Sequence, residues 1–381
     1  MHDTRVLHTL NAARVCAEYC VVVSHVTPVG NGLINNDKLA SALMSFFFVL
    51  SGFMATYTNM DTDFGVNGAR WDYIRKRLQK TYTTYLIFFL LDTPGNIMTN
   101  LEHAGRCGFY WVALLSQPLL LQAWLGSFFV GNANGIGWYL CTLLWLWFLF
   151  PFLPVRKWFS HLPAIKLTCL YCLSVLCFVA FSNVHYTTTR AFPLLRLAEF
   201  LMGSCVAFTL DRPISGWLVL PAFLGVVAYS TATYTLPDLW AFEDTTQTCQ
   251  FWPVVKRSIN PTTVLSLFSL VWCLLLQWLA ASELKGSTSA VIKALQWDFF
   301  KSLSGFSLQL YLSHVVFSTG IRHILGQLGI SNWLGVDSLL LSVYFLAYLY
   351  SLGERAGMRW CGAYLTPSQK IPQNSTQAAG V

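Results

Sequence analysis

Residues Asn11 to His25 read NAARVCAEYCVVVSH, an apolar stretch that carries three ionisable side chains. At about 100° per residue, Glu18 lies about 40° and His25 about 20° from Arg14 around a helix, so all three share one face. About 16 Å of helix axis separates Arg14 from His25, roughly half the hydrocarbon thickness of a bilayer. Ionisable groups inside a span are costly and mark candidate functional sites. The alternative is that these residues have no function beyond structure. Arg14 would then lie among the lipid head groups and form an ion pair with Glu18, and His25 would hydrogen-bond a neighbouring carbonyl.

The composition around this stretch indicates a polytopic membrane protein. Of 381 residues, 55 % are hydrophobic and 11 % are charged, whereas soluble domains carry about 25 % charged residues. We therefore expect an all-α membrane bundle of about ten transmembrane helices. The predicted spans are roughly 12–28, 39–58, 78–91, 138–153, 165–182, 190–209, 215–233, 260–281, 303–325 and 333–352. No basic domain with interleaved aromatic residues points to a nucleic-acid partner. Cys169 and Cys172 have C-x-x-C spacing, but they lie on an apolar helix without a second pair, so no metal site is expected.

The distribution of Lys and Arg predicts the orientation of these spans. With ten spans and a cytoplasmic N-terminus, most basic residues fall on the cytoplasmic side, whereas an eleventh crossing by 109–130 would divide them equally. We expect 109–130 to remain on the far side and both termini to be cytoplasmic. Residues 1–365 are expected to form one transmembrane domain, followed by a disordered polar tail at 366–381. Cys107 and Cys249 fall in predicted extracytoplasmic loops, either as a disulfide or as two unpaired thiols.

Two stretches after the first span carry further candidate residues. In SFFFVLSGFMATY, Ser51 and Gly52 interrupt an apolar span. Small residues there favour close helix approach, or a hydroxyl or backbone donor for a developing oxyanion. In YIRKRLQKTYTTY, Arg77 and Lys80 lie three residues apart on one helix face, which suits phosphate groups. The alternative for this basic run is a positive-inside membrane anchor.

Two later spans also contain ionisable residues. The segment LLRLAEFLMG places Arg196 and Glu199 three residues apart, where they can form an ion pair inside the bundle. The segment SLQLYLSHVV places His314 in an apolar helix. Its helix offers only neutral partners on the same face, so a packing role is expected for this histidine.

These motifs, taken in order, resemble acyltransferase family three, polytopic membrane enzymes that O-acylate surface glycans and other hydroxyl-bearing substrates. Arg14 and His25 match the family's pattern of Arg, ten residues and His, and Phe47 to Phe53 reads FFVLSGF as in its second span. A basic motif, an LLLQAW loop, a Phe-Pro pair, an Arg-x-x-Glu-Phe-x-x-Gly segment and a Leu-Tyr-Leu-x-His segment follow in the family's order. The resemblance covers residues from about 10 to 352.

The chain departs from the family pattern at several positions. Leu143 and Leu144 stand where many members have Glu-Glu. Lys80 replaces the second Arg of the basic motif, Thr83 stands where proline is usual, and Val315 replaces the proline after the histidine. These departures indicate a divergent branch, so the identity of this protein's substrate is not inferred from the substrates of other family members.

The resemblance implies transfer of an acyl group, acetyl or another short chain, from acyl-CoA to a hydroxyl of a carbohydrate, glycolipid or small metabolite. The expected donor site is Arg14, Arg77 and Lys80, which would hold phosphates by charge-assisted hydrogen bonds. The expected catalytic residues are His25, as the base that takes the hydroxyl proton, and Arg14. Possible supporting residues are Glu18, Ser51, Gly52, Arg196, Glu199 and His314.

A secondary transporter or flippase is the alternative of a different class. Such a protein also places Arg, Glu and His inside a helical bundle, and both classes are surrounded by membrane lipids. Transporters of this kind usually consist of two related halves with broken helices at corresponding positions. The sequence shows no such repeat, which favours the enzyme.

Overall fold

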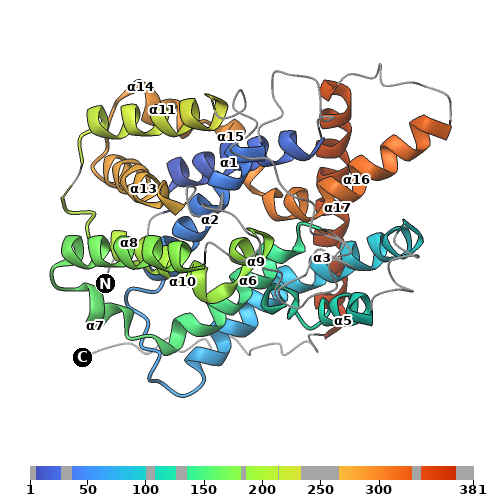
Figure 1. Ribbon diagram of the computed structural model, residues 1–381, viewed down its shortest axis with the longest axis horizontal. Helices are drawn as coiled ribbons and strands as arrows, with labels where there is room; N and C mark the ends of the chain where they lie inside the picture. Colours follow the sequence, from blue (N-terminus) through green and yellow to red (C-terminus); the bar gives the residue numbers. More distant parts are fainter. Residues whose placement is uncertain are drawn as a thin grey trace, which may run out of the picture.

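The computed structural model describes residues 6–26, 37–99, 108–125, 135–181, 186–212, 214–232, 266–327 and 336–365. This part of the chain is helical and contains no strand, which confirms the predicted all-α class (Figure 1). The predicted tail and the cysteine pair Cys107 and Cys249 lie outside the described residues.

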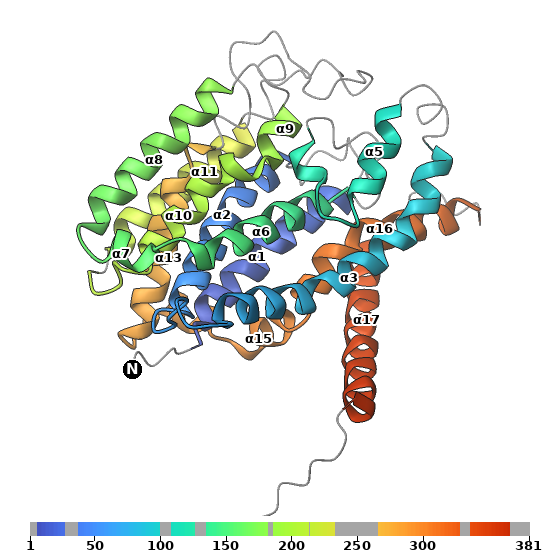
Figure 2. The same ribbon diagram turned by 90° about the horizontal axis from the view of Figure 1, so that it is seen from below.

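Each of the ten predicted spans coincides with a helix. These are α1 (His8–Val26), α2 (Asp37–Tyr57), α3 (Ala69–Thr99), α6 (Gly137–Leu149), α8 (Pro163–Ala180), α10 (Pro193–Val206), α11 (Gly216–Ala232), α13 (Ser269–Leu284), α16 (Ser307–Gln327) and α17 (Val336–Leu365). Shorter elements connect them: α5 (Gly108–Ser116), η1 (Gln122–Trp124), η2 (Phe150–Phe152), α7 (Val155–Phe159), α9 (Tyr186–Ala191), α14 (Ala290–Leu295) and α15 (Asp298–Ser304). In Figure 2, α17 extends away from the other helices.

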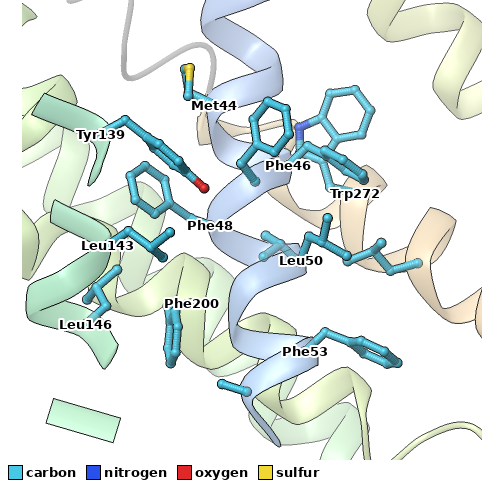
Figure 3. Close-up of a cluster of buried hydrophobic side chains, with 14 of the residues drawn as sticks. Met44, Phe46, Phe48, Leu50, Phe53, Tyr139, Leu143, Leu146, Phe200 and Trp272 are labelled. Carbon is cyan, nitrogen blue, oxygen red and sulfur yellow. The ribbon is translucent and has the colours of Figure 1, made fainter. Parts of the chain in front are cut away.

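Helix α2 lies at the centre of the bundle, and its residues from Ala42 to Tyr57 are buried or half-buried. Its side chains pack in two directions, with Tyr139, Leu143 and Leu146 of α6 on one side and Trp272 of α13 on the other (Figure 3). Phe48 lies 5.1 Å from Tyr139 and Phe46 lies 5.7 Å from Trp272, measured between ring centroids. The predicted second span therefore forms the core against which the polar helices pack.

Two glycines allow α2 and α10 to cross at backbone contact. A Cβ on Gly52 would lie 1.8 Å from the carbonyl oxygen of Phe200, and a Cβ on Gly203 would lie 1.8 Å from that of Val49. Ser204 strengthens the crossing because its hydroxyl donates to the Gly52 carbonyl at 3.2 Å. Of the two roles considered for Gly52, close helix approach is the one that the structure supports.

We expect Gly52→Ala to destabilise the protein by about 1–3 kcal/mol, the usual cost of overpacking a core, because the obstacle is a backbone carbonyl that cannot rotate away. Thermal unfolding in detergent micelles measures the loss. Gly225→Ala is the matched control, because a Cβ at Gly225 in α11 meets nothing within 4 Å. Equal melting temperatures for the two variants would contradict the close crossing.

The start of α1 is fixed by a carboxylate from another helix. Glu283 of α13 accepts hydrogen bonds at 2.9 Å from the backbone N–H groups of His8 and Thr9, and at 2.7 Å from the Thr9 hydroxyl. These N–H groups belong to the first turn, where a helix has no internal acceptor and where negative charge is favourable. Glu283 therefore fixes the position of α1 and, with it, the polar face predicted from Arg14 to His25.

The ten-span count remains a prediction. Among the described helices, α8 alone is both long and apolar enough to cross a bilayer by length and composition, with a mean hydropathy of 1.9. Four shorter stretches are apolar: Ala42–Tyr57, Gly137–Phe152, Gly216–Ala228 and Ser269–Leu284. Large apolar side chains are nevertheless exposed along three helices, a pattern that fits contact with lipid. Examples are Leu176 on α8, Leu218 on α11 and Phe345 on α17.

The segment predicted not to cross contains α5, a turn and η1. Nine residues of α5 span about 14 Å, half of a hydrocarbon layer. The turn at Leu120 (φ 56°) brings the chain back, and Trp145 of α6 donates to the Leu120 carbonyl at 2.8 Å. Gln122 is fully buried and donates to the Tyr85 hydroxyl of α3 at 3.0 Å. The described part of this segment is thus anchored between α3 and α6.

Candidate active site

A polar cavity of about 180 Å³ lies between α1, α2, α3, α6 and α16. It is lined by Arg14, Glu18, Phe47, Leu50, Ser51, Arg77, Thr81, Tyr139, Leu143, Trp147, Ser307, Leu308 and Tyr311. Four of the residues predicted for the site, Arg14, Glu18, Ser51 and Arg77, therefore meet in one place although they come from three helices.

Arg14 reaches the cavity from α1 and is held by one end of its guanidinium group. Nη2 donates to the backbone carbonyl of Ser304 at 3.1 Å, at the C-terminus of α15. This contact is favourable because the last carbonyls of a helix carry partial negative charge. Nε of Arg14 is buried and has no hydrogen-bond partner among the described residues. The backbone contact thus fixes the side chain and leaves a donor available to a bound group.

Arg77 enters the same cavity from α3 and is held by aromatic rings. Its guanidinium carbon lies 5.2 Å from the ring centroid of Tyr73 and 4.9 Å from that of Trp147. Cation–π contacts of this kind position an arginine without using its N–H donors. Lys80 lies one turn further along α3, and its side chain is outside the described residues. The structure therefore places one of the two residues of the basic motif in the cavity.

Glu18 brings a carboxylate into this basic environment. Its side chain is 3 % exposed, and the surrounding groups that act on it are the Ser307 hydroxyl, the Arg14 guanidinium and the Tyr311 backbone. One carboxylate oxygen has no hydrogen-bond partner among the described residues. A buried carboxylate with an open oxygen is a candidate for holding a proton or orienting a ligand hydroxyl.

The two predicted histidines lie together outside the cavity lining. His25 of α1 and His314 of α16 are in ring contact, with centroids 5.4 Å apart and planes at 41°. His314 is fully buried, whereas His25 is exposed. From the sequence, these histidines were expected to have separate roles. Helical periodicity predicts neighbours within one helix, whereas this contact is between two helices.

Two tyrosines connect the cavity with the histidines. Tyr311 lines the cavity, and its ring centroid lies 5.4 Å from that of Tyr139 and 5.9 Å from that of His314. Its hydroxyl donates to the Ile136 carbonyl at 3.1 Å, which fixes the ring between the two regions. Arg14 and His25 were expected on one continuous polar face. Both residues lie on α1, but only Arg14 lines the cavity, whereas His25 contacts His314.

Arg196 and Glu199 form a buried ion pair and are not among the residues that line this cavity. Arg196 Nη1 donates to Glu199 Oε2 at 2.8 Å, and both side chains are at most 3 % exposed. Ser45 of α2 donates to the other carboxylate oxygen, and Arg196 Nε donates to the Arg190 carbonyl at 2.8 Å. The pair therefore ties α10 to α2 and α9, which is the structural role considered from the sequence.

Sequence reasoning missed three residues of this region: Tyr139, Tyr311 and Arg190. Tyr311 precedes His314 by three positions and so shares its helix face, a signal that was available. Arg190 of α9 lies over the Trp138 ring at 4.8 Å and acts electrostatically on His25. This proximity is tertiary and has no counterpart in the sequence. No group of three or more metal-ligand side chains occurs among the residues that the structure describes.

The opposite face of α1 borders a second hollow of about 660 Å³. Ala13, Cys16, Ala17 and Cys20 of α1 line it together with apolar residues of α2, α11, α13 and α14. It contains no ionisable side chain other than these thiols. Helix α1 thus separates an apolar hollow from the polar cavity, which explains why its ionisable residues share one face.

The chain belongs to acyltransferase family three: the family model described as an acyltransferase domain matches residues 7–352. This protein is therefore an acyltransferase, a member of a family that is typically membrane-embedded. Acyltransferase MdmB of Streptomyces mycarofaciens is 24 % identical over an alignment covering 98 % of this chain and 97 % of that protein. No solved structure matches the chain. The predicted family and enzyme class are confirmed.

Proposed function

We propose that the enzyme transfers a short acyl group from a coenzyme A thioester, bound from the cytoplasm, to a hydroxyl of a carbohydrate, glycolipid or small metabolite. The observation that carries this proposal is the convergence of Arg14 and Arg77 on one cavity whose lining also contains hydroxyl groups and Glu18. Guanidinium groups bind phosphate oxygens through paired, charge-assisted hydrogen bonds.

In the proposed reaction His25 is the general base. The acceptor hydroxyl attacks the thioester carbonyl carbon while its proton moves to a ring nitrogen of His25, and the carbon–sulfur bond breaks as the tetrahedral intermediate collapses. The proton then passes to the leaving thiolate, so the enzyme returns to its starting state. The hydroxyl of Ser51, which lines the cavity, is the candidate donor to the negative charge that develops on the carbonyl oxygen. Direct transfer of this kind requires Tyr311 to move or the substrates to meet beside it.

The test of this proposal is an assay of purified protein in lipid nanodiscs with a panel of radiolabelled acyl-CoAs. We expect release of the coenzyme A thiol that increases when a hydroxyl-bearing acceptor is added, with the label recovered as an ester. Saccharide, glycolipid and small-alcohol acceptors separate the three acceptor classes. Folded protein that neither hydrolyses nor transfers any acyl group of the panel would contradict the proposal.

A further prediction concerns the donor site. We expect Arg77→Ala and Lys80→Ala each to raise the donor KM roughly ten- to a hundred-fold, because losing one charge-assisted hydrogen bond costs about 1.5–3 kcal/mol. Turnover at saturating donor should change little, since a phosphate clamp contributes equally to substrate and transition state. Arg75→Ala is the control, because Arg75 is exposed on the same helix and pairs with Asp72 at 3.2 Å. A reduced kcat with unchanged KM would contradict the clamp.

A further inference from the structure

The hydrogen bonds of His314 determine its tautomer. Nδ1 lies 2.8 Å from the backbone carbonyl of Tyr311 and 3.3 Å from that of Leu310. Both partners only accept hydrogen bonds, so Nδ1 must carry the hydrogen, and the neutral ring then has its lone pair on Nε2. This assignment follows from the partners of the ring. His314 therefore presents an acceptor at the end of a fixed imidazole.

That acceptor has no hydrogen-bond partner among the described residues, although it is fully buried. An unsatisfied buried acceptor is costly, and a side chain with only a packing role would be expected to avoid it. The neighbouring polar ring is His25, whose centroid is 5.4 Å away. Other ionisable groups near the pair are Tyr311, at 5.9 Å from His314, and Arg190, which acts electrostatically on His25.

We propose that His314 is a positioning residue for the proposed base: its Nε2 accepts a hydrogen bond from one ring N–H of His25, so that the other nitrogen of His25 keeps its lone pair toward the acceptor hydroxyl. A base oriented by a third group is a recurring arrangement in acyl transfer. Catalytic hydrogen bonds are often long without substrate and shorten when substrate binds. The ring contact between His25 and His314 is consistent with such a bond. This inference rests on the proposed function of His25.

The proton transfer balances with this arrangement. The hydroxyl proton moves to the free nitrogen of His25, producing an imidazolium whose second N–H is held by Nε2 of His314. Nδ1 of His314 stays bonded to the carbonyl of Tyr311 throughout, so the pair neither gains nor loses a proton over the cycle. His314 touches no substrate in this scheme and acts only through His25.

Two substitutions separate positioning from packing. In His314→Asn, the amide nitrogen replaces Nδ1 and keeps a donor to the carbonyl, but the Nε2 acceptor is lost. In His314→Gln, the amide reaches the position of Nε2 and keeps an acceptor there. We expect His314→Asn to lower kcat about tenfold, the effect of losing one hydrogen bond, with the donor KM unchanged. We expect His314→Gln to retain more than half of the activity.

The double variant gives the sharpest test. Because His314 acts through His25, adding His314→Asn to His25→Ala should cause no further loss. Losses that multiply would overturn the inference and assign His314 a separate role. If His25→Ala is itself fully active, the proposed function of His25 fails instead, which is a distinguishable result.

The tautomer of His314 and its contact with His25 can also be measured by spectroscopy. With histidine labelled by ¹⁵N, NMR should show one ring with hydrogen on Nδ1 and a hydrogen-bonded lone pair on Nε2, and the Nε2 signal should shift in His25→Ala. A His314 ring protonated on Nε2, or a signal that is unaffected by His25→Ala, would overturn the inference.

Discussion

Replacing His25 by alanine is expected to reduce acyl transfer by at least about 10²-fold, the lower end of the loss on removing a general base. The imidazole is exposed at the end of α1, next to His314. The imidazole is therefore accessible to an acceptor hydroxyl, and the ring of His314 contacts it. Since an imidazole must be neutral to accept a proton, transfer by the wild-type enzyme should also fall as the medium is acidified.

Turnover at matched membrane abundance is the measurement for this variant. His161→Ala is the control, because His161 is exposed between α7 and α8 and has no place in the proposed reaction. Near-normal transfer by His25→Ala together with complete loss in His314→Ala would require the two roles to be exchanged. The sequence predicts that His314→Ala affects mainly folding, whereas the inference above predicts that loss of the His314 acceptor lowers kcat less than His25→Ala does.

The second large effect is expected from breaking the buried ion pair of Arg196 and Glu199. Glu199→Leu leaves a guanidinium group buried without its carboxylate, which should destabilise the protein by about 3–5 kcal/mol. The remaining hydrogen bond from Arg196 to the Arg190 carbonyl does not neutralise the charge. Thermal unfolding in micelles and the amount of folded protein in membranes both report this loss.

A double variant distinguishes an uncompensated charge from a mere loss of contacts. Arg196→Met combined with Glu199→Leu removes both charges and should recover most of the stability, because apolar replacements of a buried pair are often neutral. The exposed pair Lys301–Asp298, at 2.7 Å, provides the control: Asp298→Asn should leave the melting temperature almost unchanged, because exposed ion pairs contribute little to stability. A double variant as unstable as Glu199→Leu would contradict this explanation.

Much of the fold followed from the sequence because hydrophobic periodicity and length report helices directly. All ten predicted spans contain helices, with ends displaced by several residues. The largest difference is α3, which begins at Ala69, before the basic run, and continues past Pro94 to Thr99. The span was predicted from its apolar residues, so the charged first turns of α3 were not included in it.

Part of the candidate site could also be predicted from the sequence. Ser51 and Gly52 were singled out from the sequence, and the structure places them differently. Ser51 lines the cavity, whereas a Cβ on Gly52 would collide with the backbone of Phe200. The residue types were informative, but the choice between an oxyanion donor and a helix contact depended on which helix lies opposite.

The sequence by itself determined the family, the helical class and the single polar face of α1, because these depend on residue order and on the 3.6-residue repeat of one helix. The tertiary structure alone decided that Arg77 joins Arg14 in one cavity and that His25 contacts His314. These pairs come from helices far apart in the chain. Their meeting depends on how α1, α3 and α16 pack around α2, and helical periodicity carries no information about the neighbour across an interface.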